Sequence, residues 1–156
     1  MTCILSESSN GQRQFFVLDP LSGRGPLLLQ RDLKECSHWS LSPDAKSIGC
    51  LFSDYLGEIE IINLKGNEER RVSVKGTHFT DLHWAPDNVQ VFVSNFSSVR
   101  ARDEIGIVDL NGDFKLLYTA PYSAATIGAP SPSPDGHYLA FEELNFDFNV
   151  ALLENY

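Results

Sequence analysis

The sequence has few basic residues, no long apolar run and little cysteine. It holds 12 Lys and Arg against 21 Asp and Glu, which gives a net charge of −9. Nucleic-acid binding depends largely on Lys and Arg that neutralise phosphates, so this balance argues against a nucleic-acid partner. No apolar stretch approaches the roughly 20 residues that a membrane helix needs. The first ten residues also lack the basic start and apolar core of a secretory signal. We therefore expect no nucleic acid and no membrane as partners of this segment, and its compartment stays open.

The three cysteines are odd in number and show no C-x-x-C spacing. They are Cys3, Cys36 and Cys50. Zinc sites and redox motifs in proteins place cysteines in close pairs, which this sequence does not do. We expect buried free thiols rather than a disulfide or a reactive thiol.

Three Pro-Asp turns divide the chain at regular intervals. They occur in "HWSLSPDAKSIGCLF", "LHWAPDNVQVFV" and "APSPSPDGHYLAF", each followed by an alternating apolar run. Their prolines, Pro43, Pro86 and Pro134, are 43 and 48 residues apart. Proline presets the backbone of a turn, and Ser and Asp hydrogen-bond to the nearby backbone. Each motif therefore predicts a hairpin between two strands.

The residue after each Pro-Asp pair differs between the three motifs. Gly136 suits the positive φ that closes such a turn, and Asn88 tolerates it. Ala45 fits that conformation poorly, so we expect a relaxed or differently typed turn there.

A second repeating signal lies between the Pro-Asp turns. It consists of "FFVLDPLSG", "IEIINLKG", "IGIVDLNG" and a terminal "VALLENY". The polar markers Asp19, Asn63, Asp109 and Glu154 are 44, 46 and 45 residues apart. Two interleaved signals with one period indicate a repeat architecture.

The alternating segments predict two whole four-stranded units with an incomplete unit on each side. The expected strands of the first unit are 2–7, 15–18 and 27–30, and those of the second are a strand around 39 and then 47–53, 58–64 and 70–74. The expected strands of the third unit are 81–84, 89–95, 104–110 and 115–119. Those of the fourth unit are 127–131, 138–142 and 149–153. The corresponding pieces of the chain are about 1–33, 34–76, 77–121 and 122–156.

A four-stranded antiparallel unit that repeats at this interval is typical of a β-propeller blade. We therefore predict an all-β partial propeller, in preference to a sandwich or a single barrel, neither of which needs regular spacing. Trp39 and Trp84 are expected at equivalent positions on inner strands, where they would pack between blades rather than stack on a substrate.

The motifs "WSLSPDAKSI" and "PSPDGHYLAF", followed by the second repeating hairpin, resemble the TolB-type, WD-like propeller repeat over nearly the whole chain. The segments "ILSESSNGQRQFFVLDPLSGRGPLL" and "PSPDGHYLAFEELNFDFNVALLENY" are similar to propellers at the C-terminus of acidobacterial winged-helix regulators and of eukaryotic-like serine/threonine kinases. This resemblance implies a sensory or interaction module of a bacterial signalling protein. Asn88 and Ala45 depart from the glycine of the family turn.

No motif reaches the specificity of a catalytic signature. The sequence lacks G-x-S-x-G, a phosphate-binding glycine loop and the kinase motifs. His38 and His83 each precede a tryptophan and could line a central channel as a metal or anion site, but ordinary histidines are the preferred reading. We expect no catalytic, cofactor-binding or metal-binding residue. The stretch "SSVRARDE" lengthens one connection, so Arg100, Arg102 and Asp103 form a possible contact loop.

The remaining predicted site residues are structural. The turn residues are Pro43, Asp44, Pro86, Asp87, Pro134, Asp135 and Gly136. We expect a non-catalytic module that binds a protein or a small ligand on its loop faces. The alternative is a propeller hydrolase or lyase with Asp, Glu and His around a central channel. Unclosed blades expose strand edges, so we also expect self-association or the remainder of a longer propeller to cover the ends.

Overall fold

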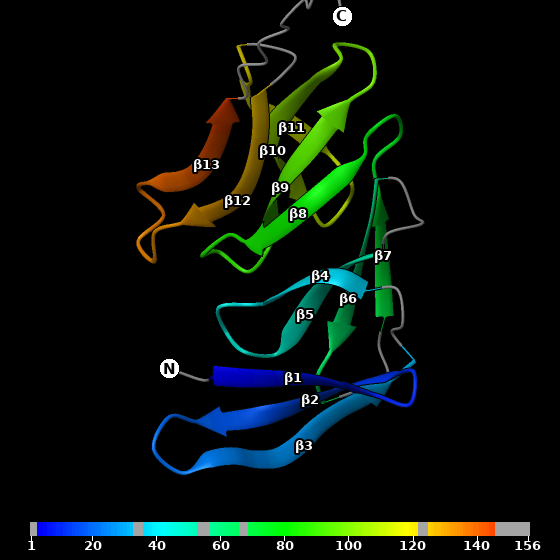
Figure 1. Ribbon diagram of the computed structural model, residues 1–156, viewed down its shortest axis with the longest axis vertical. Helices are drawn as coiled ribbons and strands as arrows, with labels where there is room; N and C mark the ends of the chain where they lie inside the picture. The colour runs from blue at the N-terminus through cyan, green and yellow to red at the C-terminus, as the bar shows by residue number, and fades with distance from the viewer. Residues whose placement is uncertain (1–2, 33–35, 53–56, 66–68, 122–124, 146–156) are drawn as a thin grey trace, which may run out of the picture.

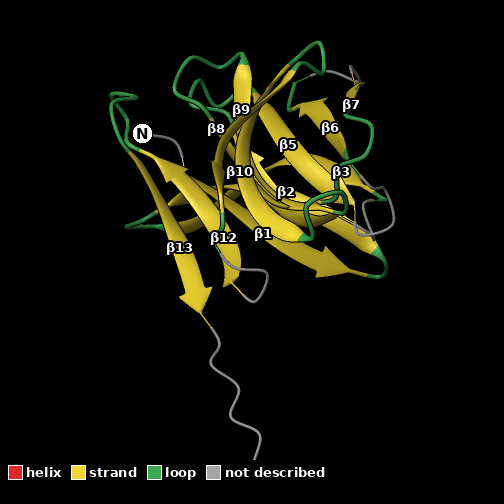
Figure 2. Ribbon diagram, turned by 90° about the horizontal axis from the view of Figure 1, so that it is seen from above, coloured by secondary structure: helices red, strands yellow, loops and turns green. Residues whose placement is uncertain are grey.

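The computed structural model describes residues 3–32, 36–52, 57–65, 69–121 and 125–145. These residues form thirteen strands in four antiparallel sheets, and they contain no helix. Figure 2 accordingly shows the described residues as strands and loops alone. The predicted all-β fold is confirmed. Within the described residues, no helix long and apolar enough to cross a membrane is found.

The sheets follow one another along the chain (Figure 1). The first sheet contains β1 (Cys3–Ser9), β2 (Gln12–Asp19) and β3 (Gly23–Arg31). The second contains β4 (Cys36–Leu41), β5 (Ser47–Phe52), β6 (Glu58–Asn63) and β7 (Glu69–Ser73). The third contains β8 (Phe79–Trp84), β9 (Gln90–Ser97), β10 (Arg102–Asp109) and β11 (Phe114–Thr119). The fourth contains β12 (Ala125–Pro132) and β13 (Leu139–Asn145). The expected strand 149–153 lies outside the described residues.

Each Pro-Asp turn joins the first two strands of its sheet. In the second sheet, the Ala45 N–H donates to the Ser42 carbonyl at 2.8 Å, and the Gly136 N–H makes the equivalent bond to Ser133 at 2.9 Å. Ala45 has a φ of 57°, beside 62° for Asn88 and 73° for Gly136. The expectation of a different turn at Ala45 was wrong. The hydrogen bonds of the turn hold alanine in a left-handed conformation that costs about 1–2 kcal/mol.

The turn aspartates are fixed by their own loops. The Ser42 hydroxyl donates to Asp44 at 2.8 Å, and the Ser133 hydroxyl donates to Asp135 at 2.5 Å. These hydrogen bonds are the largest cause that lowers the pKa of Asp44 and of Asp135 below the ordinary value for aspartate. The Ser-Pro-Asp sequence thus builds a turn that is stabilised by a charged carboxylate.

Within the described residues, the hydrophobic core forms three clusters, one at each junction between successive sheets. The cluster between the first and second sheets contains Phe15, Cys36, Ile48, Cys50, Ile62 and Leu64. The cluster between the second and third contains Leu51, Ile59, Ile61, Val72, Phe79, Leu82, Trp84, Val91, Val93 and Val108. The cluster between the third and fourth contains Ile105, Ala120, Ala125 and Ile127. Burial of these faces against each other is the main stabilising contribution.

Both tryptophans lie at these junctions, but not at equivalent positions. Trp39 packs edge-on against Phe15, with ring centroids 5.2 Å apart. The Trp84 indole N–H donates to the Ser40 carbonyl at 3.1 Å. Leu41 pairs with Ile48 as Trp84 pairs with Val91, so Trp84 corresponds to Leu41 and not to Trp39. The predicted equivalence was therefore wrong by two residues, which leaves the side chains on the same face.

The structure joins Cys36 to Cys50 by a disulfide, with Cα atoms 5.7 Å apart, and leaves Cys3 as a free thiol. Our expectation of free thiols was therefore wrong for two of the three cysteines. The bond connects β4 to β5 within one sheet, across a β-bulge next to Cys36. The sequence spacing carries no sign of this pairing, because the strand register brings the two residues together.

Candidate functional site

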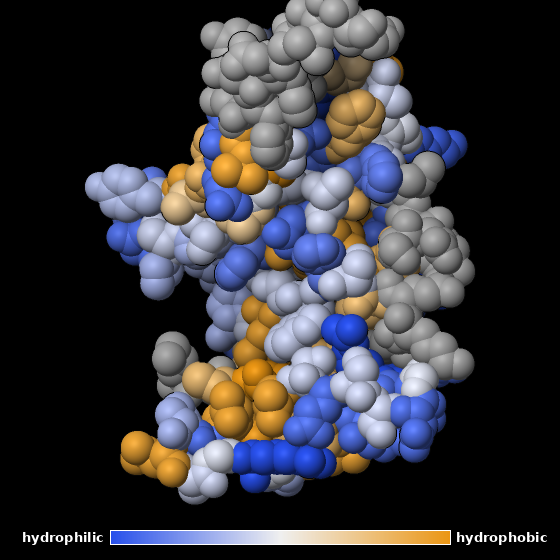
Figure 3. Space-filling model, viewed as in Figure 1, coloured by the Kyte–Doolittle hydropathy of each residue, from blue (hydrophilic) through white to orange (hydrophobic). Residues whose placement is uncertain are grey.

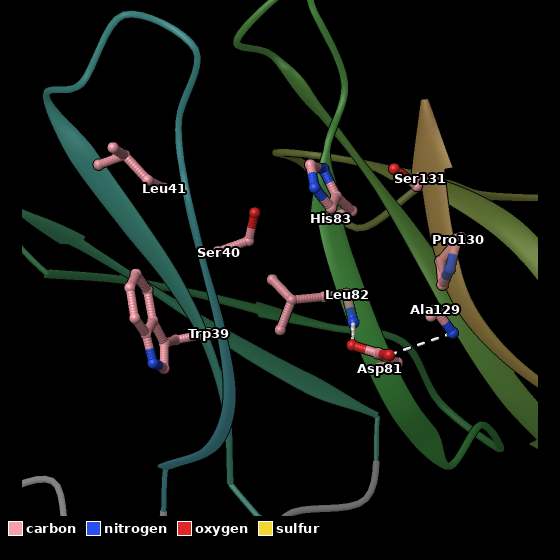
Figure 4. Close-up of a pocket in the computed structure, with 9 residues that line it drawn as sticks. All are labelled: Trp39, Ser40, Leu41, Asp81, Leu82, His83, Ala129, Pro130 and Ser131. Carbon is pink, nitrogen blue, oxygen red and sulfur yellow. Dashed lines mark hydrogen bonds between the residues drawn. The ribbon is translucent and has the colours of Figure 1, made fainter. Parts of the chain in front are cut away.

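A pocket of about 450 Å³ opens where the first strands of three successive sheets converge (Figure 4). β8 lies beside both β4 and β12. Each strand contributes three consecutive lining residues: Trp39, Ser40 and Leu41; Asp81, Leu82 and His83; and Ala129, Pro130 and Ser131. The pocket is therefore formed by the corresponding strands of three repeats.

Asp81 connects the three strands. One carboxylate oxygen accepts the Leu82 N–H at 2.8 Å, and the other accepts the Ala129 N–H at 3.1 Å on the next sheet (Figure 4). The first oxygen also lies 3.5 Å from His38 Nδ1 on the preceding sheet. Asp81 thus satisfies a backbone donor on β12 and pairs with a side chain on β4.

The two histidines of the channel hypothesis have different roles. His38 corresponds to Asp81 in the repeat, and His83 corresponds to Ser40, so the expected equivalence of the two histidines was wrong. His83 is exposed, and its Nδ1 lies 3.2 Å from the Trp84 carbonyl. A ring N–H at Nδ1 would leave the His83 Nε2 as a free acceptor. Among the described residues, no three His, Cys, Asp or Glu side chains gather as a metal site would require.

Half of the segment "SSVRARDE" is strand, so the connection is shorter than the lengthened loop that we expected. β9 and β10 pair up to Ser97 and Arg102, which leaves residues 98–101 as the connection. The hairpin is longer than that of the second sheet because both of its strands are extended. The exposed apex includes Val99, which is 91% exposed.

The three residues predicted for a contact loop all have partners within the chain. Arg100 pairs with the buried Glu104, and Arg102 donates to the Ala120 carbonyl at 3.4 Å. Asp103 accepts the Ile127 N–H at 3.0 Å. The bonds of Arg102 and Asp103 hold the segment that enters the fourth sheet. A contact role for this hairpin stays a prediction and concerns its apex.

The sequence interpretation missed Asp81 and the buried Glu104. Glu104 is 2% exposed and accepts a hydrogen bond from the side-chain amide of Asn95. The side-chain oxygen of Asn95 in turn accepts the backbone N–H of His78. A signal for Asp81 was present in the sequence. Asp81 follows His38 by 43 residues and precedes Ala129 by 48, which are the spacings of the three turn prolines. Glu104 had no such signal, because its burial depends on the extended hairpin.

The pocket can bind by hydrogen bonding and apolar contact. His83 and Ser131 are exposed, Asp81 is partly exposed, and Leu82 and Pro130 are buried. A mixed lining of this kind and size is typical of sites that hold a small ligand or a side chain of a partner.

No family model matches this sequence, and no curated protein matches it. Among solved structures, a TolB-type protein from Agrobacterium tumefaciens is 19% identical, with a TM-score of 0.66 over 93% of this chain and 51% of its own. TolB from Acinetobacter baumannii is 20% identical, with a TM-score of 0.64 over 90% of this chain and 34% of its own. The β-propeller domain of Cps50 (Swd1) from Myceliophteria thermophila is 14% identical, with a TM-score of 0.58 over 91% and 48%.

An oligogalacturonate lyase from Vibrio parahaemolyticus is also similar, at 12% identity and a TM-score of 0.57 over 83% of this chain and 38% of its own. This chain thus spans about half of one TolB-type structure and about a third of the other. The sheets, their order and these neighbours together show that the chain has the fold of a partial β-propeller, of the TolB-type and WD-like kind.

Proposed function

We propose that this chain is a non-catalytic binding module whose inner pocket contacts the ligand. The observation that carries the proposal is the convergence of β4, β8 and β12 on one pocket, with His83 and Ser131 exposed at its surface. Its volume of about 450 Å³ suits a small polar molecule or one or two side chains of a partner protein.

The bonds around Asp81 support binding rather than chemistry at that carboxylate. Its two oxygens already accept two backbone N–H groups and face His38. A carboxylate held in this way positions strands and is poorly placed to move a proton. His83 and Ser131 are therefore the groups that we assign to the ligand.

The repeat resemblance extends the proposal to the parent protein. The module would be the sensory part of a bacterial regulator or of a serine/threonine kinase whose effector domain lies elsewhere. The resemblance of residues 4–28 and 132–156 to such propellers supports this step. The net charge of the module is acidic, so the module would attract a partner of opposite charge.

A thermal-shift titration with amino acids, dipeptides and short uronides tests the binding site. We expect a compound that raises the melting temperature of the wild type to have no effect on Ser131→Trp, because the indole fills the pocket. Thr80→Trp, at an exposed position of β8 outside the pocket lining, is the matched control and should keep the response. A response that persists in Ser131→Trp would place the ligand elsewhere and overturn the proposal.

A lyase or hydrolase is the second candidate, favoured by the similarity to the oligogalacturonate lyase and by His83 beside Asp81 in the pocket. Oligogalacturonate and a panel of chromogenic esters serve as substrates. We expect no turnover. Turnover that His83→Ala abolishes, while Thr80→Trp retains it, would favour the enzyme over the binding module.

A further inference from the structure

The far face of the first sheet, which is the face turned away from the second sheet, carries positions that are buried elsewhere in the chain. Three cross-strand pairs occupy the same place in their sheets: Cys3 with Leu18, Ile48 with Ile62, and Val91 with Val108. In the second and third sheets, this pair packs against the preceding sheet. The first sheet thus repeats an inter-sheet contact surface.

The burial of this pair differs between the sheets. Ile48, Ile62, Val91 and Val108 are each at most 1% exposed. Cys3 and Leu18 are only partly buried. Leu27, which pairs with Phe16 on the same face, is 48% exposed. Figure 3 shows apolar side chains at the level of the first sheet of Figure 1, with hydrophilic side chains along much of the lower edge.

Polar side chains lie over and around this apolar surface, and Phe16 on it is only 4% exposed. Arg24 lies 3.7 Å above the Phe16 ring and pairs with Glu7 at 3.1 Å, while half of its side chain stays exposed. On the same face, Gln14 donates to Gln30, and Gln30 donates to Gln12. An apolar centre with a polar border is the usual composition of a protein–protein contact surface.

The fourth sheet presents the opposite kind of surface. Phe141 and Glu143 contact Tyr118 of the third sheet. Because side chains alternate along a strand, Ala140, Glu142 and Leu144 point to the other side. Glu142 and Leu144 are exposed, Leu144 by 46%. This is the face on which a following sheet would pack in the propeller arrangement.

The two ends of the chain also differ in charge. Residues 1–33 contain three arginines and three acidic residues, so this piece is neutral. Residues 122–156 contain five acidic residues and neither lysine nor arginine. Among their described residues, Glu142 lies on the far face of the fourth sheet. Arg24 on the first sheet therefore has an opposite charge available at the other end of the chain.

We propose that two copies of this chain associate head to tail, with the far face of the first sheet of one copy packed on the far face of the fourth sheet of the other. The contact continues the sheet-to-sheet packing that each copy already makes three times. It is heterologous, because different faces meet. Leu27 and Leu18 would pack near Leu144 and Ala140, and Arg24 would face Glu142.

Sedimentation velocity from micromolar to millimolar concentration tests the proposal on the full chain. We expect the mass to rise with concentration and Leu27→Glu to weaken the association about tenfold or more, because it places a charge in an apolar contact. Leu21→Glu is the matched control. Leu21 is 99% exposed in the turn between β2 and β3, so its substitution should leave the association unchanged.

Exchanging the two charges distinguishes a specific contact from nonspecific association. Arg24→Glu and Glu142→Arg should each weaken association about tenfold, and the double variant should recover most of the loss. Lys46→Glu, in an exposed turn, should have no effect. Circular dichroism verifies that every variant is folded. A chain that stays monomeric at millimolar concentration, or an association that Leu27→Glu leaves intact, would overturn the proposal.

Discussion

The side-chain oxygen of Asn88 accepts the backbone N–H of Asp44 at 2.9 Å, which ties the Pro-Asp turn of the third sheet to that of the second. Asn88 occupies the position that is Gly136 in the next turn, where no side chain is available for the same bond. Asn88 therefore tolerates the positive φ and also adds a link between neighbouring sheets.

Exchanging these two residues should move the link. Asn88→Gly should destabilise the chain by about 1 kcal/mol through the lost hydrogen bond. Gly136→Asn should stabilise the chain by a similar amount, because the new side-chain oxygen would accept the N–H of Asp87 and asparagine tolerates this backbone conformation. Urea unfolding of both variants measures the effect. If Gly136→Asn is destabilising, the turns of the third and fourth sheets do not stack as those of the second and third do.

Ala45→Gly should stabilise the protein. Ala45 has a φ of 57°, which glycine adopts without the clash between Cβ and the carbonyl oxygen. We expect a gain of about 0.5–1 kcal/mol, since the larger entropy of glycine in the unfolded chain offsets part of the relief. Thermal unfolding gives the measurement. Ala85→Gly, at a buried position before the next turn, should be destabilising instead.

The strand positions predicted from the sequence agree best with the structure where the two repeat signals, the Pro-Asp turns and the hairpins between them, support each other. Most strands begin and end within about two residues of the expected positions, because alternation and turn residues act locally. The errors concern contacts between strands. The pairing of Trp39 and of Cys36 depends on register and on a β-bulge, which no single segment reveals.

The candidate site was harder to predict than the fold. The three pocket strands were expected, but the prediction did not include Asp81, because the two His-Trp pairs were the more visible signal in these strands. Alignment by the turn prolines places Asp81 at the position of His38 and Ala129. The hairpin around Arg100 was expected as a loop because its polar residues gave no sign of strand pairing; the partners of these residues lie in other strands.

Gly49 should not tolerate a side chain. A Cβ at this position would lie 2.8 Å from Leu82 Cδ1 and 3.2 Å from the Trp84 indole nitrogen, both on the next sheet. We expect Gly49→Ala to cost about 1–3 kcal/mol, because the buried side chains of Leu82 and Trp84 would have to shift. Gly128→Ala is the control, since nothing lies within 4 Å of its Cβ. Equal effects of the two substitutions on the unfolding midpoint would contradict this packing.

Reduction should weaken the second sheet. The Cys36–Cys50 bond closes a loop with a sequence separation of 14, which corresponds to about 3 kcal/mol of lost unfolded-state entropy. We expect dithiothreitol to lower the melting temperature of the wild type and of Cys3→Ser, but not of the Cys36→Ser/Cys50→Ser double variant. If three thiols can instead be titrated in the protein unfolded without reductant, all three cysteines are free, as expected from the sequence.

The stability should fall in acid through the turn aspartates. Hydrogen bonds from the Asp113 N–H lower the pKa of Asp109, and those from the Leu21 N–H lower the pKa of Asp19, as Ser42 does for Asp44. A lowered folded-state pKa means that the stabilisation is present above the unfolded value of about 3.9 and is lost as the pH falls through the folded value.

The variant Asp109→Asn tests this dependence. It should be less stable than the wild type at pH 7 and should lose less on going from pH 7 to pH 3, as measured by urea midpoints. An equal loss in both proteins would show that the charge of Asp109 contributes nothing to the folded state.

Every cross-sheet bond formed by Asp81, Asn88 and Trp84 joins neighbours in the series. The folding free energy of such a chain is close to a sum over sheets and junctions, as in other linear repeat arrays. Damage to one junction therefore spreads no further than the two sheets that share it, and a repeat can accumulate substitutions while distant repeats keep their packing.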